Sequence, residues 1–229
     1  MVPRKRGSLV PRAIVATCIL GVGALVAAIL IRDSLTELVE SIALEQTERY
    51  AIAIDEFRTL YTSEVVVRAQ DAGVRVTHDY KRHTGAIPLP ATLGMMFGER
   101  LTDSNDGGGV RLYSAHPFPW HGEEGGPKND FERDALEILS RSPDRTFHRF
   151  EQVNGVSSVR VATADLLRAE CVSCHNSHPD SPKTDWKEGD VRGVLAVTVP
   201  LTRALAQTQA ASYTEFTGQA VLIEFFAYW

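Results

Sequence analysis

Two cysteines and a histidine stand close together in the last third of the chain. Cys171, Cys174 and His175 form the pattern C-x-x-C-H, which is the spacing of covalent c-type haem attachment. Two thiols at this spacing can add to the two vinyl groups of one haem, and the adjacent imidazole can then bind the iron as its proximal ligand. The motif therefore predicts one covalently bound haem c.

Other uses of the cysteine pair need features of their own. A disulfide between Cys171 and Cys174 would close a short, strained and redox-active loop. A structural zinc site needs four ligands, and the sequence has no second cysteine pair. A thioredoxin-like site follows a βαβ pattern, which we do not find. The third cysteine, Cys18, lies in an apolar run and is interpreted as a small apolar residue.

The beginning of the chain has the features of a membrane anchor. Residues 1–12 hold four basic residues and no acid, and residues 13–31 are uncharged and apolar, AIVATCILGVGALVAAILI. About 20 apolar residues span a bilayer core, and the run lacks the small-residue cleavage site that ends a signal peptide. The positive-inside rule then predicts one span with residues 1–12 in the cytoplasm and the remainder outside.

Composition excludes some classes of function. The net charge is −5 and no basic stripe is interleaved with aromatic residues, so the sequence predicts no nucleic-acid binding. It contains no nucleophile elbow, no phosphate-binding glycine loop and no H-E-x-x-H pattern. We therefore expect a binding protein and not an enzyme. A length of 229 residues allows one medium-sized domain with accessory segments.

The remainder of the chain predicts an α+β domain. Apolar residues recur at three- and four-residue intervals between 50 and 65, which predicts a stalk helix over 33–72, ended by Gly73. Its apolar stripe invites formation of a homodimer or burial against its own domain. A shorter amphipathic helix is expected over 131–139. Alternating and β-branched runs predict strands of an antiparallel sheet at 110–115, 146–153, 157–162 and 192–201.

Three segments resemble a known family: TGAIPLPAT, VRLYSAHPFPW and CVSCHNSHPDSPKTDWKEGDVRGVLAVTVPL. They are similar to PAS-like, haem-c-binding extracytoplasmic domains, which are tethered to bacterial membranes in front of histidine-kinase, cyclase or chemotaxis modules. The resemblance covers Leu35–Leu205 and implies a PAS-like haem domain over 73–205, with the long helix packed on its sheet. It also implies a bacterial inner-membrane protein with a periplasmic haem domain and a signalling partner in the membrane.

The end of the chain departs from that pattern. Sensors of this kind continue into a second transmembrane helix and an output domain. The last nine residues here, VLIEFFAYW, are too few to cross a bilayer. We expect residues 206–229 to form a C-terminal helix or part of a truncated second membrane segment.

The second axial ligand of the iron is the open question of the site. His78 is our first candidate because it follows the stalk helix within the family resemblance, and His116, fixed by neighbouring prolines, is the second. His178 follows His175 too closely to reach the opposite face of a haem. Thioether ligation is a further alternative. The remaining candidates are interpreted as solvated (His83, His121), structural (His148) or apolar filler (Met95, Met96).

Three residues after the motif are candidate haem contacts. Lys183 and Arg192 could pair with the haem propionates, and Trp186 offers a flat apolar face to the porphyrin. Two functions then fit the sequence. The first is a redox or gas sensor, and the alternative is a tethered monohaem cytochrome or an accessory electron-transfer subunit of a membrane redox complex.

Overall fold

The computed structural model of the protein describes residues 9–102 and 108–201. The first eight residues of the expected cytoplasmic tail and the whole expected C-terminal segment 206–229 lie outside the described residues. The chain divides into two compact units, Met1–Ser41 and Ile42–Trp229, and each is described by itself.

The first unit is one apolar helix. Helix α1 (Leu9–Leu60) begins in this unit, and its large apolar side chains between 19 and 31 are at least half exposed. Among the described residues this is the one helix long and apolar enough to cross a membrane, judged by length and composition. The exposed apolar side chains between 19 and 31 are suited to the hydrocarbon core of a bilayer. Exposed to water, such a continuous apolar surface would be unfavourable.

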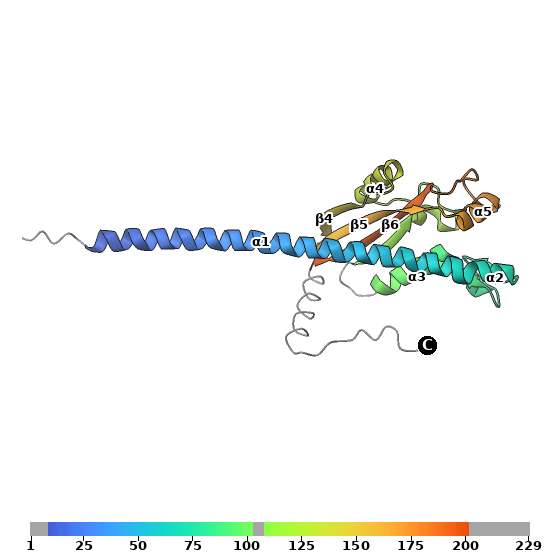
Figure 1. Ribbon diagram of the computed structural model, residues 1–229, viewed down its shortest axis with the longest axis horizontal. Coiled ribbons are helices and arrows are strands. Elements are labelled where there is room, and N and C mark those ends of the chain that lie inside the picture. Colours follow the sequence, from blue (N-terminus) through green and yellow to red (C-terminus); the bar gives the residue numbers. More distant parts are fainter. Residues whose placement is uncertain (1–8, 103–107, 202–229) are drawn as a thin grey trace, which may run out of the picture. The chain divides into compact units, whose positions relative to one another are not determined.

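A four-stranded antiparallel sheet forms the centre of the second unit (Figure 1). Its strands are β3 (Gly109–Tyr113), β4 (Phe147–Val153), β5 (Val156–Leu166) and β6 (Val191–Pro200), in the order β3-β6-β5-β4. Strands β4 and β5 form a hairpin whose turn residues, Asn154 and Gly155, both have positive φ. An Asn-Gly pair adopts that conformation readily, and this explains why the chain reverses there.

The two faces of the sheet hold two separate cores. On one face, Ala51 and Ile54 of α1 pack against Val159, Val161 and Val197. On the other, helix α4 (Asp130–Arg141) packs through residues that include Phe131, Ala135 and Leu139. Because successive strand residues point to opposite faces, β6 contributes Leu195 to the first core and Val194 to the second. Helices therefore cover both faces (Figure 1).

The remaining elements lie around this framework. The long helix continues from α1 as a π-helical segment η1 (Tyr61–Val66) and the short α2 (Val67–Asp71). Helix α3 (Pro90–Thr102) contacts β3, and α5 (Ala169–Ser177) lies between β5 and β6 in the chain. The smallest elements are a parallel pair, β1 (Val76–Thr77) and β2 (Ile87–Pro88), and two 3-10 turns, η2 (Tyr80–Arg82) and η3 (Pro119–Gly125).

The α+β class, the long N-terminal apolar helix and the antiparallel sheet are confirmed. Each predicted strand is present, and β5 runs on to Leu166, past its predicted end at 162. Helix α3 was not predicted, because Pro88 and Pro90 indicated a loop. Pro90 is instead the first residue of α3, where a proline costs no hydrogen bond.

A buried carboxylate joins α4 to the sheet. The Glu132 side chain is 1% exposed, and Arg111 of β3 and Arg160 of β5 form ion pairs with it at 3.0 and 3.5 Å. The backbone N–H of Lys128 donates to the same carboxylate at 2.8 Å. Asn129 caps the helix by accepting from the N–H of Glu132 at 3.0 Å. The carboxylate thus pairs with Arg111 and shares Arg160 with Glu151, whose carboxylate lies 2.8 Å from Arg160 Nη1.

We expect Glu132→Gln to lower the free energy of unfolding by about 3 kcal/mol, because it leaves the partly buried Arg111 without its anion and leaves Arg160 with Glu151 alone. The matched control is Glu137→Gln on the same helix, whose ion pair with Arg141 is exposed and should contribute less than about 1 kcal/mol. Urea unfolding of the full chain, followed by circular dichroism, measures both. Equal losses in the two variants would contradict this assignment.

Candidate functional site

Helix α5 carries the three residues of the C-x-x-C-H motif. It begins after Arg168, whose extended backbone stands at the N-cap position, and covers Ala169–Ser177. Residues three and four apart lie on one face of a helix, so Cys171, Cys174 and His175 share a face. All three line one pocket.

The cysteines are free thiols. Cys171 is half-buried, and Cys174 and Cys18 are exposed, so the structure does not contain the alternative disulfide. The described residues also contain no group of three or more His, Cys, Asp or Glu that could hold a metal ion. Burial raises the pKa of both Cys171 and Cys174, which keeps them as protonated thiols at neutral pH. The described part of the chain therefore lacks a zinc site of the kind that the sequence left open.

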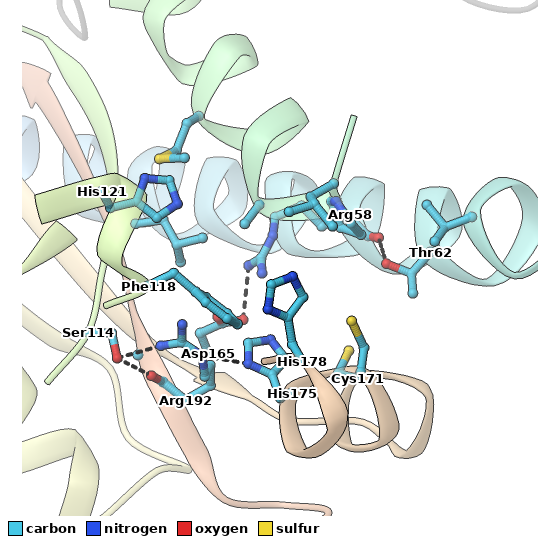
Figure 2. A pocket seen from close by; sticks show the side chains of 18 of the residues that line it. Arg58, Thr62, Ser114, Phe118, His121, Asp165, Cys171, His175, His178 and Arg192 are labelled. Atoms are coloured by element: carbon cyan, nitrogen blue, oxygen red, sulfur yellow. Dashed lines mark hydrogen bonds and ion pairs between the residues drawn. The ribbon is translucent and has the colours of Figure 1, made fainter. Parts of the chain in front are cut away.

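The pocket is mostly apolar and opens to solvent. Its cavity volume is about 170 Å³. Its walls come from the end of α1, from η1, from the loop around Phe118 and from α5 (Figure 2). Thr62 and Val66 of the π-helical segment are among its lining residues. An apolar hollow that is open to solvent therefore lies beside the thiols.

His175 is held as a neutral imidazole. Burial, the larger cause, and the positive charge of Arg192 lower its pKa to about 4, while the charge of Asp165 opposes the change. Arg192 Nε donates a hydrogen bond to His175 Nδ1 at 3.2 Å. A neutral imidazole has a lone pair that can bind a metal. Two thiols and a neutral imidazole on one helical face are the donor set that a c-type haem requires.

Arg192, at the start of β6, is a half-buried cation without an anionic partner. It donates to Ser114 Oγ at 2.5 Å, and no carboxylate of the described residues forms an ion pair with it. Burial lowers its pKa. Nearby, Trp120 Nε1 is buried without a hydrogen-bond partner in the described part of the chain. An unpaired guanidinium and an unpaired indole N–H suit a ligand that carries anionic or acceptor groups.

Two ion pairs connect α1 to the chain just before α5. Arg58 Nη1 donates to Asp165 Oδ1 at 3.0 Å, and both side chains are about one tenth exposed. Arg168 Nη2 donates to Asp55 Oδ2 at 2.9 Å. Burial opposes the charge of Arg58, but the charge and hydrogen bond of Asp165 outweigh it and raise the pKa of Arg58. These contacts hold the start of α5 against the long helix.

A stack of rings runs along one wall of the pocket. His78 lies flat on Trp120, with centroids 4.2 Å apart, and Trp120 lies flat on Phe118 at 4.3 Å. The Phe118 ring is 5.3 Å from those of His175 and His178. The stack links residues distant in sequence, from β1 to α5, and provides the flat apolar surface of the site.

The structure brings together only some of the predicted site residues. Cys171, Cys174, His175 and Arg192 line the main pocket, while His78 is covered by Trp120 and is not among the lining residues. His116, Lys183 and Trp186 line a second hollow, which shares Arg192 with the first. Lys183 Nζ lies 4.5 Å from the centre of the Trp186 ring.

Sequence reasoning missed four residues of the main pocket: Arg58, His121, His178 and Met95. His178 was set aside for its closeness to His175, and His121 for its polar, glycine-rich surroundings. Met95 was interpreted as apolar filler, and its neighbour Met96 instead meets the hydroxyl of Tyr80 at 3.5 Å. These four residues are recognised only by their positions relative to segments that are distant in the sequence. The sequence contains no signal for those positions.

The fold and the site define an α+β domain that offers two thiols and an imidazole to one pocket. Residues 36–200 match the model of the Tll0287-like family, and the chain belongs to this family. The matched range lies within Leu35–Leu205, the range of the expected resemblance. One similar solved structure is titled "Crystal structure of the cyanobacterial heme-protein Tll0287". It has 16% sequence identity and a TM-score of 0.39, over 73% of this chain and 95% of that chain. No curated protein matches.

We expect Asp165→Asn to cost about 3 kcal/mol of unfolding free energy, because Arg58 would lose its nearest carboxylate in a buried place. Asp134→Asn is the control, since its ion pair with Arg149 is half-exposed and should contribute less than about 1 kcal/mol. Chemical unfolding of the full chain measures the difference. A cost for Asp165→Asn no greater than the control's would show that this ion pair does not hold the site.

Proposed function

We propose that this chain is a membrane-anchored monohaem c-type protein, in which Cys171 and Cys174 hold the haem and His175 binds its iron. The observation that carries the proposal is the placement of two free thiols and a neutral imidazole on one face of α5, in an apolar pocket. Membership of a family named after Tll0287, which a solved structure's title calls a heme-protein, supports the same cofactor.

Attachment needs only the chemistry of the thiols. Each thiol adds across one vinyl double bond: a C–S bond forms, the π bond breaks, and the thiol hydrogen passes to the neighbouring carbon. No electrons are gained or lost, so no oxidant is required. When bound, haem supplies reversible one-electron chemistry and a metal that can take small exogenous ligands.

Arg192 changes its partner in this proposal. A neutral imidazole that binds a metal through Nε2 carries its hydrogen on Nδ1, so Nδ1 no longer accepts the hydrogen bond that Arg192 donates at 3.2 Å. The guanidinium is then free for an anionic group, and we assign it to a haem propionate. Lys183 and Trp186, across the second hollow, are assigned as further contacts to the same part of the cofactor.

We expect Cys171→Ala/Cys174→Ala to abolish haem staining on a denaturing gel, because no thioether bond can form. Cys18→Ser is the matched control, since this thiol lies in the apolar helix outside the pocket, and it should stain like the wild type. Single cysteine variants should keep one bond and stain weakly. An unstained wild-type protein, produced where c-type haem is attached, would end the proposal.

The function that we favour is that of a redox or gas sensor. The pocket is bordered by the π-helical segment η1, and such segments often occur at functional sites. The same helix is continuous in sequence with the apolar segment. A change at the iron could therefore alter η1 and pass along the helix to a partner protein in the membrane or to a second copy of the chain. In this proposal the protein is no enzyme, and its haem domain lies in the periplasm of a bacterial inner-membrane protein with a cytoplasmic N-terminus.

The second candidate function is that of a tethered cytochrome or an accessory electron-transfer subunit. The stacked rings of Phe118, Trp120 and His78, about 4 Å apart, favour it, because they connect the pocket with half-exposed His78 and could couple a bound haem to an external donor or acceptor.

Hydrogen–deuterium exchange distinguishes the two functions. A redox sensor should show at least roughly threefold different exchange at residues 61–66 between the oxidised and reduced protein, because opening of that segment changes. Residues 130–141, on the opposite face of the sheet, are the internal control and should exchange equally in both states. Equal exchange throughout the chain would favour the electron carrier.

A further inference from the structure

His121 stands across the main pocket from α5. It belongs to η3 (Pro119–Gly125), and Figure 2 shows it on the wall opposite the helix that carries Cys171 and His175. Its ring is half-buried, and its centroid is 6.0 Å from that of Trp120. Burial lowers the pKa of His121, so the ring is neutral at pH 7. A second imidazole therefore faces the same space from the other side.

Both ring nitrogens of His121 are uncommitted. No described residue forms a hydrogen bond or an ion pair with its side chain, and its backbone N–H alone is bonded, to Phe118 O at 2.9 Å. The ring is half-exposed and lines the open pocket, so its nitrogens are accessible to a ligand that enters the pocket. Its lone pair is available without breaking any contact.

The other histidines of the site are engaged or face elsewhere. His178 Nδ1 accepts the backbone N–H of Asp180 at 3.1 Å, which puts the hydrogen of the neutral ring on Nε2 and leaves no free lone pair. A backbone amide in a turn cannot move aside as the side chain of Arg192 can. His78 is covered by Trp120, and His116 lines the second hollow. Met95, on α3, is the remaining competitor in the main pocket.

The loop backbone is shaped around His121. Gly122, directly after it, has φ +50°, a region that side chains other than glycine rarely adopt. A Cβ at Gly125 would lie 2.8 Å from the Cβ of His121 and 2.5 Å from that of Pro117. Two glycines thus let the chain fold tightly enough to keep the imidazole at the pocket wall.

We propose that His121 is the second axial ligand of the haem iron, opposite His175. The inference rests on the proposed function, because it requires a haem attached to α5. It replaces the first-ranked candidate from the sequence, His78. A nitrogen ligand on each side would make the iron six-coordinate and low-spin, and an exogenous ligand would have to displace His121 in order to bind.

The test uses the full chain with its haem attached and records ferric visible and electron paramagnetic resonance spectra. We expect a low-spin wild type and a high-spin His121→Leu variant. External imidazole should bind His121→Leu on the order of tenfold more tightly or better, since no internal ligand competes with it. His121→Met should remain low-spin and have a higher potential, because a thioether replaces the imidazole. A merely structural histidine would not give this rescue.

Met95→Leu, His78→Leu and His178→Gln are the matched controls, and each should keep the wild-type spectrum. Haem staining of every variant separates the two levels of inference, because the thioether bonds do not depend on His121. Stained protein with a high-spin wild type, or with low-spin His121→Leu, overturns the assignment of His121 and leaves the proposed function intact. Loss of the low-spin signal in a control variant instead of His121→Leu assigns the ligand to that residue. Unstained wild type overturns both.

Discussion

The site depends on the ion pair between Arg58 and Asp165, at the point where β5 turns into α5. Asp165 lies where the pairing of β5 with β6 shifts its register, and such an irregularity redirects a strand. The carboxylate that ends the regular strand is the one that holds the buried guanidinium of α1. With the second pair, Arg168 to Asp55, it fixes the direction in which α5 leaves the sheet. The cysteines face the pocket for that reason.

Charge is distributed unevenly around the pocket. On the α1 side, Arg58 has a close carboxylate partner. On the β6 side, Arg192 is bonded only to Ser114 and His175 among the described residues. Burying half of a cation without an anionic partner costs free energy. A bound ligand with an anionic group would offset that cost. The same arginine lines both hollows, so it is available to an anionic group in either one.

The ring stack and the neutral imidazole act together. Phe118 lies beside His175, with ring centroids 5.3 Å apart, and adds to the burial of that imidazole. Burial is the main reason for the lowered pKa of His175, and the positive charge of Arg192 adds to it. A histidine held in this way is ready to bind a metal at physiological pH without first losing a proton. The fold thus prepares the ligand before the cofactor arrives.

The sequence by itself determined the C-x-x-C-H motif, on which the proposed haem attachment rests, and most of the secondary structure. The spacing of Cys171, Cys174 and His175 fixes what these side chains can hold, because all three lie within five residues and one turn of backbone relates them. Alternating side chains likewise predicted β6, and an Asn-Gly pair marks the hairpin of β4 and β5. These elements could be predicted because secondary structure depends largely on residues that are close together in the sequence.

Tertiary structure alone decided what stands opposite the motif. The sequence favoured His78 as the second ligand and indicated a solvated His121, because nothing local to either residue reports its distance from α5. Packing put a tryptophan over the first and left the second at the pocket wall. The physical reason is that a ligand from a distant segment is selected by burial and by free lone pairs, which arise only when the loop around Phe118, the long helix and the sheet have packed together.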